Sequence, residues 1–254
     1  MKRRLITIPI SHYCEKARWA LHRAGLDYDE EPHVQGVHQR VARRTGGGST
    51  VPVLVTGDGQ VLTESEQILR YADERVDDDA RMFPLDPALR REVEALSRDL
   101  DEHLGPTARR VMYSHMFGQR KLMLRVNCQT VPTVERLVMT AVWPFAVRWG
   151  KRQLGMVPDT RAEDERSTRV VFDQIAERLQ ESGGPYLFGD RFTAADLTFA
   201  ALSAAVTVPP QYGVTLPQPD ELAAETAEMV RSFREHPAGS YAMRLFETHR
   251  WATA

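Results

Sequence analysis

The feature that most constrains the fold of this chain is a change of hydrophobic pattern near residue 76. Before that point, short apolar runs typical of strands alternate with helical repeats. From about residue 88 onward the pattern is helical, with almost no strand signal. The sequence therefore predicts an α/β domain over residues 1–76 and an all-α helical bundle over 88–254, joined by a linker over 77–87.

The first domain is predicted to be a small mixed sheet with helices packed on it. Its apolar runs predict strands over residues 4–10, 26–32, 51–55 and 61–62. The turn Asp58-Gly59 joins the last two strands as a hairpin. Helical spacing from Cys14 to Leu21 predicts a helix after the first strand, and the polar segment 33–50 carries only a weak helical pattern.

Two helices begin with the signature of a capping box, in which a threonine and an acidic residue three positions later satisfy each other's backbone N–H groups. These are Thr63 with Glu66, and Thr193 with Asp196. We assign the second box to the folding of the helical domain, without a part in chemistry. The helices predicted beyond residue 62 cover residues 63–74, 91–104, 161–181, 192–206 and 221–236.

Composition excludes several classes of function. The net charge is −2 with intermixed signs, which predicts no nucleic-acid partner. Two cysteines, Cys14 and Cys128, suggest neither a disulfide framework nor a metal site, so we expect no metal and a cytoplasmic location. The apolar stretch 137–149 is shorter than the roughly 20 residues of a membrane span, and it predicts a buried or interface helix.

Four short motifs follow one another in a characteristic order. They are Ser11-His12-Tyr13-Cys14 after the first strand, Val51-Pro52-Val53-Leu54, the pair Glu64-Ser65, and the run from Gly184 to Asp196. Together they resemble the S-P-F-C-type turn, the V-P-x-L strand, the E-S pair and the capping element of the cytosolic glutathione transferases. The resemblance spans residues 5–206, and residues 105–160 contain no motif that we recognise.

The resemblance implies a thioredoxin-like first domain that binds glutathione. Val51 would pair its backbone with the extended tripeptide, next to a cis peptide bond at Pro52. Ser65 and its helix N-terminus would hold the γ-glutamyl carboxylate, and Glu64 the ammonium group. Thr50 stands where the family often has a lysine. Because Thr63 is expected to cap this helix, Glu64 and Ser65 are free for binding.

Three side chains of the first motif are candidates for handling the thiol. The resemblance assigns Ser11 as the hydrogen-bond donor to the thiolate sulfur. Cys14 occupies the second position of a C-x-x-C-like pair, and it also lies on the apolar stripe of its helix, where it would simply pack in the core. Tyr13 has an ionisable hydroxyl, but it comes late compared with the strand-borne tyrosine of other members.

These residues leave three hypotheses open. The first is a transferase that attaches glutathione to a small, apolar electrophile, held in part by Met112, Met116 and Phe117 at helical spacing. The second is a glutathione-dependent thiol-disulfide reductase acting through Cys14, and the third is a binding protein without turnover. Another low-molecular-weight thiol could replace glutathione. By analogy with the family, we expect a homodimer.

Overall fold

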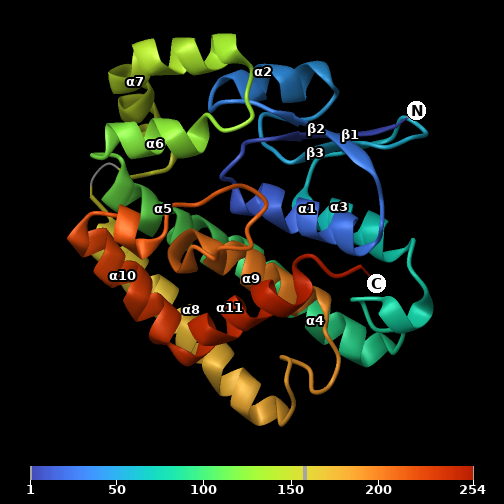
Figure 1. Cartoon of the computed structure of the whole chain (residues 1–254). Coiled ribbons are helices and arrows are strands. Elements are labelled where there is room, and N and C mark those ends of the chain that lie inside the picture. The colour runs from blue at the N-terminus through green and yellow to red at the C-terminus, as the bar shows by residue number, and fades with distance from the viewer. Residues whose placement is uncertain (1, 157–158, 254) are drawn as a thin grey trace.

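The computed structural model describes residues 2–156 and 159–253 (Figure 1). Its sheet has four strands in the order β2-β1-β3-β4. β1 pairs in parallel with β2, and β3 is antiparallel to both β1 and β4. The strands are β1 (Arg3–Thr7), β2 (Tyr28–Pro32), β3 (Val53–Val55) and β4 (Val61–Leu62). The thioredoxin-like sheet expected from the sequence is confirmed.

Helices cover both faces of this sheet. α1 (His12–Arg23) and α3 (Ser65–Asp73) pack on one face, and α2 (Val37–Arg44) lies on the other (Figure 1). Successive residues of a strand point to opposite faces. Leu5 accordingly belongs to the large core, while the next residue, Ile6, packs with Ala42 of α2 and Val53.

The capping box predicted for Thr63 and Glu66 is wrong. α3 begins at Ser65, Glu64 is its N-cap residue, and no described side chain caps it. The carboxylate of Glu66 instead pairs with the buried ammonium of Lys16, with 3.3 Å between the charged atoms, and with Arg70. A buried cation therefore competes successfully for the acid that the local pattern assigned to the helix end.

Beyond β4 the regular elements of the described residues are helices, apart from two isolated β-bridges within residues 186–191. A single turn of π-helix over Leu100–Leu104 carries α4 directly into α5, across Gly105 and Pro106. Pro237 opens a last helix that the sequence did not indicate. The helices are α4 (Pro87–Asp99), α5 (Gly105–Met116), α6 (Arg120–Asn127), α7 (Thr133–Gln153), α8 (Arg161–Ser182), α9 (Ala194–Thr207), α10 (Ala224–Glu235) and α11 (Pro237–His249).

α9 lies at the centre of the helical region and is buried along almost its whole length. The capping box of Thr193 and Asp196 at its start is confirmed. The Asp196 carboxylate also accepts hydrogen bonds from the Leu187 backbone N–H, at 2.9 Å, and from the Tyr241 hydroxyl. Burial raises the pKa of Asp196, against the effect of these donors. One acidic side chain thus ties the helix start to the preceding loop and to α11.

α7 was expected to be a buried or interface helix, and only one of its faces is buried. Met139 and Trp143 are inside, whereas several other apolar side chains of the same helix are exposed. Within residues 2–156 and 159–253, no helix is both long enough and apolar enough to cross a bilayer.

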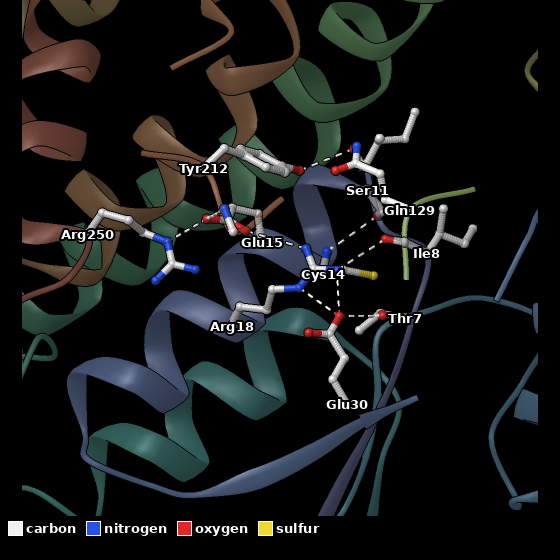
Figure 2. Close-up of polar contacts among 12 residues, drawn as sticks. Thr7, Ile8, Ser11, Cys14, Glu15, Arg18, Glu30, Gln129, Tyr212 and Arg250 are labelled. Carbon is white, nitrogen blue, oxygen red and sulfur yellow. Dashed lines mark hydrogen bonds and ion pairs between the residues drawn. The ribbon is translucent and has the colours of Figure 1, made fainter. Parts of the chain in front are cut away.

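The first domain is locked to the helical region through the buried carboxylate of Glu15 in α1. Arg250, just after α11, donates to it at 2.5 Å, and the Gly213 backbone N–H donates at 3.0 Å. On its other side lies Arg18 at 3.4 Å, which also donates to Glu30 at 2.7 Å. Figure 2 shows Glu15 between the two arginines. We call this cluster of Glu15, Arg18 and Arg250 the Glu15 clamp.

We expect Glu15→Gln to lower the free energy of unfolding by about 3–5 kcal/mol, because it leaves buried guanidinium groups without their shared carboxylate. Urea unfolding followed by circular dichroism measures this. Glu74→Gln is the matched control: its side chain is 70% exposed, so a change within about 0.5 kcal/mol is expected. A loss below 1 kcal/mol in Glu15→Gln would show that the clamp contributes little.

Candidate functional site

The site is built around Ser11, at the turn between β1 and α1. Ser11 is the N-cap residue of α1, and its hydroxyl oxygen accepts a hydrogen bond from the Cys14 backbone N–H at 3.4 Å. The side chain is half-buried and lines a cavity of about 380 Å³. Its O–H is therefore positioned to donate to a group inside this cavity while its lone pair caps the helix.

The other two candidates of the turn do not line this cavity. The Tyr13 hydroxyl donates to the Asp101 backbone carbonyl at 2.8 Å, and burial raises its pKa to about 12. Cys14 is fully buried, and burial raises the pKa of its thiol as well. Both groups are held in their neutral forms, and Cys14 occupies the core position that its place on the apolar stripe predicted.

The opposite wall of the cavity belongs to the helical region. Met112, Met116 and Phe117, the residues suggested from helical spacing, all line it. Further methionines, Met123 and Met139, lie beside them. Other parts of this wall come from α7 and from the segment after α9, through Trp143, Ala146, Val147, Val208, Tyr212 and Leu216. The cavity therefore lies between the two domains and is mainly apolar on its helical side.

The residues predicted to hold the tripeptide lie on the first domain, and only one of them lines this cavity. Thr50 is at the cavity wall, whereas Val51, Pro52, Glu64 and Ser65 are not among the described residues that line it. The Val51-Pro52 peptide bond is cis, as the resemblance implied. Glu64 is exposed and Ser65 is buried, at the uncapped start of α3.

His12 and Arg109 also line the cavity, although neither is among the site residues predicted from the sequence. Burial, together with the charge of Arg109, lowers the pKa of His12 to about 3, so its imidazole is neutral. Arg109 is half-buried, its Nε atom has no hydrogen-bond partner, and it forms no ion pair with any described residue. A cation without a partner anion therefore stands beside the Ser11 turn.

The helical pattern held a signal for Arg109. It precedes Met112, Tyr113 and Met116 by three, four and seven residues, which is the spacing of a single helix face. Its neighbour Arg110 points elsewhere and pairs with Asp164. The sequence shows two adjacent arginines, and only the structure distinguishes the one without a partner.

A comparison with protein-family models finds a known domain in the first part of the chain. Residues 5–80 match the family model described as glutathione S-transferase, N-terminal domain. A search among curated protein sequences finds no match to the chain.

Solved structures match along nearly the whole chain. A glutathione S-transferase from Xanthobacter autotrophicus Py2 has a TM-score of 0.62 and 19% identity, covering 97% of this chain and 93% of that chain. A glutathione S-transferase from Ceriporiopsis subvermispora, in complex with glutathione, has a TM-score of 0.62 and 19% identity, covering 98% of each chain.

A more distant match is the β-etherase LigF from Sphingobium sp. strain SYK-6, with a TM-score of 0.56 and 17% identity, covering 96% of this chain and 99% of that chain. At these identities the structural matches establish the fold. Residues 5–80 of this protein match the glutathione S-transferase N-terminal domain, and the chain as a whole has the glutathione S-transferase fold.

Proposed function

We propose that the protein transfers glutathione to a small electrophile, with Ser11 as the hydrogen-bond donor to the glutathione thiolate. The observation that carries this proposal is the position of Ser11 on the wall of a cavity whose opposite wall is apolar. The thiol would lie at the Ser11 turn, and the electrophile would pack against Met112 and Phe117. The cavity volume of about 380 Å³ suits a small molecule.

Two groups favour the thiolate form of the bound thiol. A hydrogen bond from the Ser11 hydroxyl stabilises the negative sulfur, and the unpaired charge of Arg109 acts in the same direction. A free thiol with a pKa near ~8.5 is only about 3% ionised at pH 7. Lowering this pKa by two units raises the thiolate fraction, but the intrinsic nucleophilicity of the sulfur falls with its pKa. The net gain in rate is therefore only roughly threefold. Positioning of the electrophile must supply the rest.

The first domain offers matching partners for the tripeptide backbone. Within the described residues, the Val51 N–H and C=O make no hydrogen bond, so they can pair with an extended ligand. No side chain in the described part of the chain caps the first N–H groups of α3, and such a helix start attracts a carboxylate. Glu64 is exposed at the same place and would bind the ligand's ammonium group. Thr50, at the cavity wall, would lie near the ligand's middle.

The first test separates Ser11 from Cys14. We expect Ser11→Ala to lower kcat/KM for glutathione conjugation roughly 10- to 100-fold, since it removes a hydrogen bond to a charged atom. It should also move the pH profile to higher pH, because the thiolate loses a stabilising donor. Cys14→Ser should retain most activity. Spectrophotometric assays measure both variants. If Cys14→Ser loses activity and Ser11→Ala retains it, then Cys14 and not Ser11 acts on the thiol.

The second test concerns glutathione binding itself. We expect Glu64→Gln to raise the Kd for glutathione about 10-fold, because the ligand's ammonium loses a carboxylate partner. Isothermal titration calorimetry measures this Kd. Glu74→Gln, at the other end of α3, is the control for a lost surface charge. If the folded wild-type protein binds no glutathione, the proposed function is wrong. Binding without turnover on any electrophile would indicate a binding protein instead.

The third test concerns the reductase hypothesis, which needs an accessible Cys14 thiolate. Burial removes the thiol from solvent and raises its pKa, so the thiolate fraction at pH 7 is below its ordinary level. We expect iodoacetamide to alkylate Cys14 at least about 10-fold more slowly in the native protein than in the unfolded chain. Peptide mapping by mass spectrometry measures both rates. Rapid native labelling of Cys14 at pH 7 would favour the reductase.

A further inference from the structure

α7 lies at the edge of the molecule (Figure 1), and its outward face is apolar. Phe145 is 77% exposed, Val134 72% and Leu137 63%. Val138, Val142 and Trp149 are exposed on the same helix. Their spacings of three, four and seven residues place them on one face, opposite the buried Met139 and Trp143. We call this set of six exposed side chains the α7 stripe.

The segment that carries the α7 stripe is strongly basic. Residues 118–155 contain seven Lys and Arg residues and a single carboxylate, a net charge of +6 in a chain whose net charge is −2. The one carboxylate, Glu135, is directed inward, where it accepts from the Val34 backbone N–H at 3.0 Å and contacts His33. Arg136, Arg148, Lys151 and Arg152 are exposed and form no ion pair with a described residue.

We propose that the α7 stripe docks on the surface of an anionic lipid bilayer, with the helix lying in the plane of the headgroups. A helix with Phe, Trp and Leu on one face and Lys and Arg around it binds membrane interfaces through both apolar burial and attraction to anionic lipids. Arg148 and Arg152 alternate with Phe145 and Trp149, so their guanidinium groups can reach phosphates while their stems lie along the apolar face.

The charge of the segment favours a bilayer over a second copy of the chain. A twofold interface brings the same patch of both subunits together. For α7 this sets one exposed basic helix against another, since its only carboxylate is occupied on the inner side. Such like-charge contacts oppose association. An anionic bilayer complements the apolar stripe and the basic flank at once.

The inner face of the same helix lines the cavity, through Trp143, Ala146, Val147 and Gly150. Docking of the outer face therefore places the cavity next to the lipid. The α7 stripe meets the cavity at Trp149, which belongs to both, and vesicle binding is measured without glutathione. Its outcome is independent of the proposed transferase function.

Vesicle flotation tests the proposal. We expect the protein to float with phosphatidylcholine–phosphatidylglycerol vesicles at low salt and to stay in solution with phosphatidylcholine alone. The double variant Phe145→Ser/Trp149→Ser should weaken partitioning at least about 10-fold, because it removes the two largest apolar contacts. Lys151→Gln/Arg152→Gln should weaken it roughly 10- to 30-fold through lost attraction to the anionic surface.

Val170→Ser is the matched control, because Val170 is an exposed apolar residue of α8 outside the stripe. It should leave vesicle binding unchanged, and thermal melts should show that every variant is folded. Unchanged binding in Phe145→Ser/Trp149→Ser would overturn the proposal. A second result would also overturn it: the wild-type protein binds no vesicles, light scattering shows a dimer, and the variant dissociates that dimer. A second copy of the chain would then cover the α7 stripe.

Discussion

The Glu15 carboxylate joins the two halves of the molecule at the place where the cavity forms. It lies one helical turn beyond Ser11, and it is held by Arg250 and Gly213 from the far end of the chain. The Tyr212 hydroxyl adds a bond to the Ile10 carbonyl, directly before Ser11. Removing one partner from this packed interface would leave a buried charge unpaired, which costs several kcal/mol. The distance between the Ser11 turn and the apolar wall is set by these contacts.

The candidate site depends on both domains, because each supplies groups that the other lacks. The first domain contributes a hydroxyl and free backbone groups, whereas the helical region contributes Arg109 and the apolar wall. A second, partly buried contact, between Lys16 of α1 and Asp101 at 2.7 Å, lies close to the start of α5. The helix that carries Arg109 is thereby positioned relative to the helix that begins at Ser11.

Much of the fold follows from local sequence patterns, and the site follows only in part. The strands, the hairpin and the Thr193–Asp196 cap depend on neighbours in the chain, so periodicity and turn chemistry predict them. The Thr63–Glu66 cap failed because Lys16, distant in sequence, takes the acid. The sequence does not distinguish Arg109 from Arg110, because the difference is the ion pair of Arg110 with the distant Asp164. The exposure of α7 likewise depends on which neighbouring elements cover it. Such facts depend on tertiary packing, which local sequence patterns do not determine.

Four of the side chains that line the cavity are methionines, Met112, Met116, Met123 and Met139. Methionine is unbranched and polarisable, so such a wall adapts to guests of different outline. Three of the four belong to a small core cluster that is separate from the large one around α9. Peroxide converts each thioether to a polar sulfoxide. Oxidation of these side chains would therefore change what the cavity accepts, whereas the main core is built mostly from aliphatic and aromatic side chains, with Met82 and Met229 buried among them.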